Sequence, residues 1–447
     1  MIDYNLLTAV FLGIAVLLIL ILRFRIQAFI ALLISSIAVG VVAGIQPAEI
    51  IATMQQGMGD TLGFVAMVVG LGAMFGAILE HSGGAEALAN YLLSKFGEKR
   101  ASWALMLTGF FVAIPVFFDV AFIILVPLIY SLQRKTKKSL LLYGMPLLAG
   151  LAITHAFIPP TPGPVAVADI LKADLGWVIL FGFFTGIPTA IIAGPLFAKY
   201  ISKKIYVEAP KLVESDIKIT NYPAVGLIIA IIGIPILLIV ANTLINSPMF
   251  SGFNLSVNVR EWLKMIGHPF SALIIANVIA WYVLGIKRGI GKEALLNITT
   301  KSMAPAGIII LLTGAGGVFK QMLVNTGTGE MLANYFASEG VSILLFAFLS
   351  AAIIRILQGS ATVAMITAAG ITAPLLAADV TDIDKALLVI AIASGASIMS
   401  HVNDSGFWLV SKYLGLNEKQ TFRSWTAMTT ILALVGFVTV CLFSVIF

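Results

Sequence analysis

The stretch ASWALMLTGFFVAIPVFFDVAFIILVPLIYSLQ, residues 101–133, is apolar except near its centre, which holds Pro115 and Asp119. One helical membrane crossing takes about 20 residues, so the stretch is too long for one crossing and too short for two with a turn. Irregular backbone at membrane depth is tolerated only where it is buried in protein or lines a watery cavity. The stretch therefore predicts a re-entrant hairpin over about 101–133, with its tip facing a pathway through the protein.

The whole chain has the composition of a membrane protein. Of its 447 residues, 60% are hydrophobic and 11% are charged, whereas roughly a quarter of the residues are charged in a soluble domain. The net charge of +6 does not indicate a nucleic-acid partner, because Lys and Arg lie in short loops between apolar runs, where they specify topology. We therefore predict an all-α polytopic protein surrounded by the lipid bilayer.

About ten apolar runs are predicted to cross the membrane, and a second interrupted run, about 341–378, is predicted to form another re-entrant hairpin. Of the 27 Lys and Arg residues, 21 fall in alternate loops, 4 in the other loops and 2 within apolar runs. The positive-inside rule then places both termini outside the cytoplasm, in a multi-pass protein of the inner (plasma) membrane, and makes 199–221 a cytoplasmic linker. The predicted crossings are about 5–22, 27–45, 61–80, 139–158, 176–198, 222–245, 269–286, 303–325, 386–403 and 424–447.

A block of residues recurs in the two parts of the chain at constant spacing. Five crossings separate the copies, so the two units would lie in the membrane with opposite orientations. Inverted-topology repeats are typical of secondary transporters and place the solute site near the bilayer midplane. We therefore predict a first transmembrane half, 1–198, and a second, inverted half, 222–447. The matching residues include Gly72 and Gly316, Phe75 and Phe319, Gly83 and Gly327, and Tyr91 and Tyr335.

Each half also contains a crossing that is predicted to break at membrane depth. The first break, about 155–164, holds four prolines, which cannot continue a helix. The second, about 401–406, holds Asn, Asp, Ser and Gly instead. Broken helices in corresponding positions of two halves indicate a transport site. The alternative is that both breaks are simple ends of crossings.

Four titratable residues are candidates for proton coupling. Asp119 is a carboxylate in an apolar segment, which costs at least about 2.5 kcal/mol on permissive insertion scales and marks a functional residue by default. Burial favours the protonated form, which suits a proton carrier, although Asp119 could instead cap the second hairpin arm. His155 and His401 could titrate near neutral pH or serve as hydrogen-bonded structural residues. Asp404, which follows His401 closely, is the fourth candidate.

The second interrupted run has uncharged polar residues at its centre. Gly359 allows a tight turn, and Gln358, Ser360 and Thr362 supply hydrogen-bond donors and acceptors. These groups suit a polyhydroxylated solute, and the N-terminus of the following arm favours an anion. The second run is therefore predicted to contribute to the substrate site.

Arg355, just before that tip, is a candidate to clamp a carboxylate. It could equally pair with Asp119, with Asp404 or with a helix end. The broken helices add further candidates for substrate contact, namely Thr154, Pro160, Thr161, Gly163 and Asn403.

At these residues the chain resembles the gluconate:proton symporter family, within the ion transporter superfamily of inverted-repeat carriers. The resemblance covers nearly the whole length, and it implies proton-coupled uptake of gluconate or a related sugar acid across a bacterial inner membrane. It is densest at Gly72 to Gly84, Thr154-His155, Pro159-Pro160, Pro162-Gly163-Pro164, Gly359-Ser360-Ala361-Thr362-Val363 and Ser400-His401-Val402-Asn403-Asp404.

Two residues depart from the pattern of that family. Many members carry Glu where this chain has Asp119, and His where it has Thr161. The first change keeps an acid that is one methylene shorter. The second removes a titratable group beside the expected site and leaves the exact substrate open. Because the family also contains carriers of D-serine and of other small hydroxy acids, these substrates are alternatives.

Other classes of protein are weighed against this interpretation. Sodium coupling on the same fold would use Ser360, Thr362, Asn403 and broken-helix carbonyls as ligands. The inverted repeat argues against a channel or a sensor. An enzyme would need a catalytic constellation, and none can be named in the sequence. We expect a carrier of a small organic anion and protons, without enzymatic activity, cofactor or metal. A homodimer would follow if the crossings outside the repeat cores form a dimer scaffold.

Overall fold

The computed structural model describes residues 4–447 apart from 211–221, 247–255, 328–341, 378–379 and 403. All regular elements in the described residues are helices, which confirms the all-α prediction. Seven of these helices are long and apolar enough to cross a membrane, and four shorter apolar helices accompany them. The count of ten crossings, the inversion of the halves and the orientation of the termini stay predictions.

The first part of the chain is interrupted inside both of the regions where breaks are predicted. The first interruption separates α5 from α6 at residues 113–117, and the second separates α7 from α8 at residues 158–161. The helices are α1 (Tyr4–Leu22), α2 (Ala28–Val42), α3 (Pro47–His81), α4 (Gly84–Phe96), η1 (Glu98–Arg100), α5 (Ala101–Val112), α6 (Phe118–Thr136), α7 (Leu141–Phe157), α8 (Pro162–Leu171), α9 (Leu175–Ile191), η2 (Ile192–Leu196) and α10 (Phe197–Lys204).

The second part has the same order of elements: one long helix, two interrupted pairs and a final long helix. Its interruptions lie at 359–360 and at 397–404, the latter with residue 403 outside the described chain. The helices are α11 (Val225–Asn246), α12 (Val257–Gly267), α13 (Pro269–Ala280), η4 (Trp281–Gly285), η5 (Ile286–Arg288), α14 (Lys292–Asn325), α16 (Ile343–Gln358), α17 (Ala361–Thr372), η6 (Ala373–Leu375), α18 (Asp382–Ala396), α19 (Ser405–Leu414), α20 (Glu418–Thr421), η7 (Phe422–Thr426) and α21 (Ala427–Ile446).

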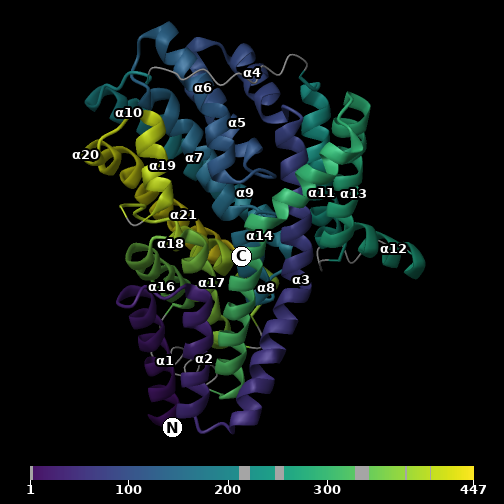
Figure 1. Ribbon diagram of the computed structural model, residues 1–447, viewed down its shortest axis with the longest axis vertical. Coiled ribbons are helices and arrows are strands. Elements are labelled where there is room, and N and C mark those ends of the chain that lie inside the picture. Colours follow the sequence, from purple (N-terminus) through teal and green to yellow (C-terminus); the bar gives the residue numbers. More distant parts are fainter. Residues whose placement is uncertain (1–3, 211–221, 247–255, 328–341, 378–379, 403) are drawn as a thin grey trace.

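The two longest helices, α3 and α14, pack against each other and lie side by side along much of the molecule (Figure 1). Their backbones approach closely because glycine faces glycine. A Cβ on Gly57 would lie 2.8 Å from the carbonyl oxygen of Gly317, and a Cβ on Gly317 would lie 2.7 Å from that of Gly57. Small residues permit such close helix contacts in membranes. Helices α5, α6 and α7 lie toward one end of this pair, and α1 and α2 toward the other (Figure 1).

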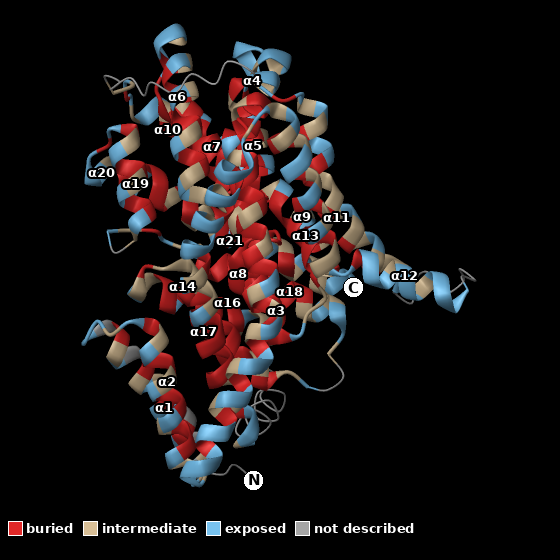
Figure 2. Cartoon of the chain, turned by 45° about the vertical axis from the view of Figure 1, so that its right-hand side comes forward, coloured by how far each residue is buried: buried red, intermediate tan, exposed pale blue. Residues whose placement is uncertain are grey.

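The most buried helices are those next to the interruptions (Figure 2). Every residue of α8 is buried, and so is every residue of α18 from Ala386 to Ala396. A helix that is apolar on all sides belongs in the interior of a protein. Helix α12, in contrast, is largely exposed and carries the exposed Trp262. The interruptions therefore adjoin the core, and Met399 and Val402 in the last of them are exposed.

The tip of the first interrupted pair packs tightly on α3, which leads to a stability prediction. A Cβ on Gly76 would lie 1.9 Å from the Pro115 carbonyl oxygen, so the backbone would have to move. We expect Gly76→Ala to destabilise the protein by about 1–3 kcal/mol, the usual range for overpacking. The measurement is the thermal unfolding midpoint of the detergent-purified protein. Gly63→Ala, where a Cβ meets nothing within 4 Å, should not lower it; equal midpoints for both variants would contradict the tight packing.

Candidate functional site

Four interruptions of the helices meet around one cavity of about 510 Å³. This volume lies in the range of small-molecule sites in proteins. The two parts of the chain both contribute. The first part does so through α6, α7 and α8, and the second through α14, α16, α17, α19, η7, α21 and Ser397, which follows α18. The polar residues that line this central cavity are Asp119, His155, Arg355, Gln358, Ser360, Thr362, Ser397, Asp404, Ser405, Trp425 and Thr429.

Four helices begin at the central cavity. Residues of the first turn of α6, α8, α17 and α19 all line it, including Asp119, Gly163, Thr362 and Gly406. The first N–H groups of a helix have no partner within the helix, and each helix N-terminus carries a partial positive charge. The convergence of four N-termini therefore makes the cavity attractive to an anion.

Local sequence explains where these helices begin. Pro162 occupies the first turn of α8, where the missing N–H costs nothing. Gly359, with a φ of 89°, ends α16 in the left-handed conformation that glycine adopts without strain. Ser360 and Asp404 then cap α17 and α19, with their side chains accepting from the backbone N–H groups of Val363 and Gly406. The cavity is thus built from ordinary helix-capping chemistry.

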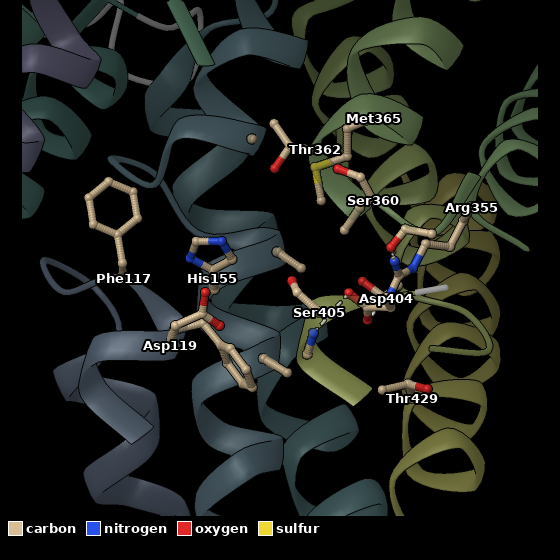
Figure 3. A pocket seen from close by; sticks show the side chains of 18 of the residues that line it. Phe117, Asp119, His155, Arg355, Ser360, Thr362, Met365, Asp404, Ser405 and Thr429 are labelled. Atoms are coloured by element: carbon tan, nitrogen blue, oxygen red, sulfur yellow. Dashed lines mark hydrogen bonds and ion pairs between the residues drawn. The ribbon is translucent and has the colours of Figure 1, made fainter. Parts of the chain in front are cut away.

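Asp119 and His155 lie on the same side of the cavity, and Arg355, Asp404 and Ser360 lie on the other side (Figure 3). Asp119 is exposed, and because it lines the cavity, this exposure is to the cavity. None of the salt bridges in the described residues includes it. Its neighbour His155 is half-buried, and its Nδ1 atom has no hydrogen-bond partner among the described residues. Asp119 is therefore a carboxylate free to bind a proton or a solute.

Arg355 and Asp404 form a buried ion pair in the wall of the central cavity. The Arg355 Nη2 atom lies 2.5 Å from the Asp404 Oδ2 atom, with 5% and 13% of the two side chains exposed. The guanidinium also donates to the carbonyl oxygen of Gly359 at the tip between α16 and α17. This settles the pairing of Arg355, for which the sequence left three partners open. The pair holds two interruptions of the second half together.

A hydrogen-bond network extends the pair to the last long helix. The Ser400 hydroxyl donates to Asp404 and accepts from Trp425 Nε1 at 2.6 Å. The Ser400 backbone N–H donates to the Thr429 hydroxyl at 3.1 Å. Buried hydrogen bonds of this kind rigidify their surroundings, so the network fixes the Asp404 carboxylate toward Arg355, whose Nε atom alone of the guanidinium nitrogens has no partner among the described residues.

The structure brings most of the predicted site residues together. Asp119, His155, Arg355, Gln358, Gly359, Ser360, Thr362, Asp404 and Gly163 all line the central cavity. Four others do not line it, and Asn403 lies outside the described residues. His401 Nε2 lies 2.8 Å from the Ile356 carbonyl oxygen. Pro160 and Thr161 line a small neighbouring cavity, where the Thr161 hydroxyl donates to the Ile158 carbonyl oxygen. Thr154 is fully buried.

The sequence interpretation missed several residues of the cavity. Phe117 and Phe118 directly precede Asp119, so the sequence signal for them was their adjacency to this aspartate. Ser405 and Gly406 follow Asp404 directly in the first turn of α19. Trp425 and Thr429, in contrast, come from η7 and α21, and no local pattern marks them. No group of three or more His, Cys, Asp or Glu in the described chain could hold a metal ion.

Comparison with known proteins finds one matching family profile and several similar transporters. The profile of the family described as GntP family permease matches residues 4–446. A gluconate permease of Pseudomonas aeruginosa is 40% identical over 96% of this chain and 95% of its own. A low-affinity gluconate transporter of Escherichia coli is 40% identical over 95% of both chains. The crystal structure of the Alcanivorax borkumensis YdaH transporter is similar in fold, with a TM-score of 0.62, 15% identity and 90% of each chain covered.

Proposed function

Because the chain belongs to the GntP family of permeases, we propose that it is a secondary active transporter that imports gluconate or a closely related sugar acid across the bacterial inner membrane. The observation that carries the substrate class is the meeting of four helix N-termini at one cavity. Such N-termini attract carboxylates through their partial positive charge and through the backbone N–H groups that the caps Ser360 and Asp404 leave unbonded. Relatives named for gluconate transport support the choice of gluconate within that class.

The other groups of the cavity suit the hydroxyls of a sugar acid. Ser360, Thr362, Ser405 and Gln358 offer donors and acceptors without net charge, and hydrogen bonds to substrate hydroxyls discriminate strongly against analogues that lack them. Arg355 is largely neutralised by Asp404. We therefore assign carboxylate binding chiefly to the helix N-termini and hydroxyl recognition to these polar side chains.

The proposed carrier consists of two inverted halves. Its support is the common order of elements in the two parts of the chain and the placement of α5 and α6 toward one end of the molecule, with α16 and α17 nearer its middle (Figure 1). In this proposal the tips of both interrupted pairs reach the central cavity from opposite membrane faces, as re-entrant hairpins do. A solute held between them would become accessible to one side at a time, as alternating access requires.

We assign proton coupling to Asp119, with His155 as its neighbour. Asp119 lines the cavity without a salt-bridge partner in the described chain, so it can exchange a proton with water there. Asp404 is less suited, because Arg355 and the Ser400 hydroxyl already bind its Oδ2 atom. His401 is bonded to the Ile356 carbonyl oxygen and does not line the cavity. Proton binding at Asp119 would offset the negative charge of the substrate during transport.

The proposal is tested with purified protein in proteoliposomes. We expect labelled gluconate to accumulate in the vesicles when an inwardly directed proton gradient is imposed. An inwardly directed sodium gradient at fixed pH should produce no accumulation. Accumulation driven by sodium alone would contradict proton coupling but would not contradict the proposed substrate. Competition by sugar acids and by D-serine identifies the preferred solute, and the absence of gluconate counterflow would contradict the function itself.

The hydroxyl of Ser400 is predicted to affect substrate affinity without touching the substrate. Ser400→Ala removes the donor to Asp404 and the acceptor of Trp425. We expect the KM for gluconate to rise about tenfold, which corresponds to the roughly 1–1.5 kcal/mol of one hydrogen bond. Ser394→Ala is the control, because that hydroxyl bonds only to the Ile390 carbonyl oxygen in the described chain. Wild-type KM in Ser400→Ala would show that the network does not shape the site.

A further inference from the structure

A second cavity, of about 270 Å³, lies behind the tip that joins α5 to α6. It is bounded by the C-terminal end of α3, by the N-terminal part of α14 and by the tip itself. Phe117 lines this second cavity and also lines the central cavity. One aromatic side chain therefore takes part in the walls of both spaces.

The second cavity is apolar inside and polar at one end. Pro115, Val116 and Val120 contribute apolar surface, while Lys301 and Ser302 are among its polar residues. Glu80 and His81, at the end of α3, and Asn297 face the same cavity. A space with few polar groups would hold a sugar acid only weakly. Weak binding suits a passage through which a solute moves, whereas a storage site would need tight binding.

The backbone of the tip is fixed, whereas the Phe117 side chain has space on both sides. The Pro115 carbonyl oxygen is so close to Gly76 that a Cβ there would lie 1.9 Å away. Phe117 is only half-buried, and its ring centroid lies 6.4 Å from that of His155 at an angle of 58°, so the two rings are not stacked. Rotation of the Phe117 ring is therefore the smallest change that would join the two cavities.

We propose that the second cavity is a transit chamber for the organic anion, and that Phe117 is the barrier between this chamber and the central cavity. The chamber lies where α3 ends and α14 begins. The nature of the anion rests on the proposed function, whereas the barrier itself does not. Phe118 is the natural comparison, because it lines the central cavity but not the chamber.

The test measures thiol labelling in sealed membrane vesicles of both orientations. Cys441→Ser removes the native thiol, the single cysteine of the chain. Ser302→Cys then reports from the chamber, and its reaction with a charged, membrane-impermeant methanethiosulfonate identifies the side to which the chamber opens. Ala361→Cys reports from the central cavity. From the side identified by Ser302→Cys, we expect Phe117→Ala to raise the labelling rate of Ala361→Cys about tenfold, equivalent to lowering a barrier by about 1.4 kcal/mol. Labelling from the opposite side should stay the same.

Matched variants make the outcome decisive. Phe118→Ala should not raise labelling from the chamber side. An equal rise from both sides, a rise for Phe118→Ala as well, or no rise for Phe117→Ala would overturn the barrier.

Ser302→Cys should react faster with an anionic than with a cationic reagent, and Lys301→Gln should remove this preference. A faster cationic reaction would contradict an anion chamber. These readouts do not depend on the transported solute, so failed gluconate uptake would refute only the function.

Discussion

Asp119→Asn is expected to abolish gluconate accumulation driven by a pH gradient while preserving gluconate counterflow. The amide has nearly the same size as the carboxyl group, but it cannot bind and release a proton as the carboxyl group does. Asp119 lines the cavity and takes part in no salt bridge of the described chain, so its replacement should not leave another charge unpaired. Proton-driven accumulation and counterflow are measured in the same proteoliposomes, which separates coupling from binding.

Two further variants control for this result. Asp119→Glu keeps an acid in place and should restore part of the accumulation. Asp169→Asn changes a carboxylate of α8 that is largely buried, lies outside the central cavity and pairs with Lys172 at 3.1 Å. It should keep proton coupling. If Asp119→Asn accumulates gluconate with an altered affinity only, Asp119 is not the coupling site.

Breaking the pair of Arg355 and Asp404 is expected to produce the largest loss of stability. Removing one partner of a buried ion pair leaves an uncompensated charge and costs about 3–5 kcal/mol. Both side chains are largely buried, and the pair joins the tip between α16 and α17 to the start of α19. We therefore expect Arg355→Gln and Asp404→Asn each to lower the thermal unfolding midpoint strongly and to reduce gluconate uptake.

The double variant separates folding from function. Arg355→Gln combined with Asp404→Asn leaves no buried charge, so it should recover much of the unfolding midpoint lost in each single variant. Uptake should remain low, because the network from Trp425 to Gly359 no longer holds the cavity wall. Additive losses of stability in the double variant would show that the two residues do not act as a pair.

The sequence predicted the interruptions because they follow from residue types. Pro115 and the adjacent prolines at 159 and 160 disfavour a helix, and Gly359 accepts a positive φ. Proline alone does not decide the matter, because Pro127 and Pro146 lie inside α6 and α7. The limits of the breaks were less predictable. Helix α7 continues to Phe157, so His155 lies in its last turn instead of in the break. Helix α18 already ends at Ala396, and Met399 adopts a φ of 45°, which its residue type does not predict.

The composition of the site could be predicted only in part, since some of its contacts join distant residues. Asp119 and Ser360 stand out as polar residues in apolar runs, and both line the cavity. The choice of Asp404 as the partner of Arg355 depends on the packing of α16 against α18 and could not be derived from spacing. Trp425 enters through a π-helical segment, η7. Such segments are frequent at functional sites, but they have no simple residue code.

The claim that the anion occupies the cavity where four helices begin is tested most directly by substrate protection. In the Cys441→Ser background, Ala361→Cys places a thiol in the first turn of α17, inside the cavity. We predict that gluconate slows its labelling with a half-maximal effect near the KM for uptake, and that uncharged glucose does not. Unchanged labelling at gluconate concentrations that saturate uptake would contradict the account.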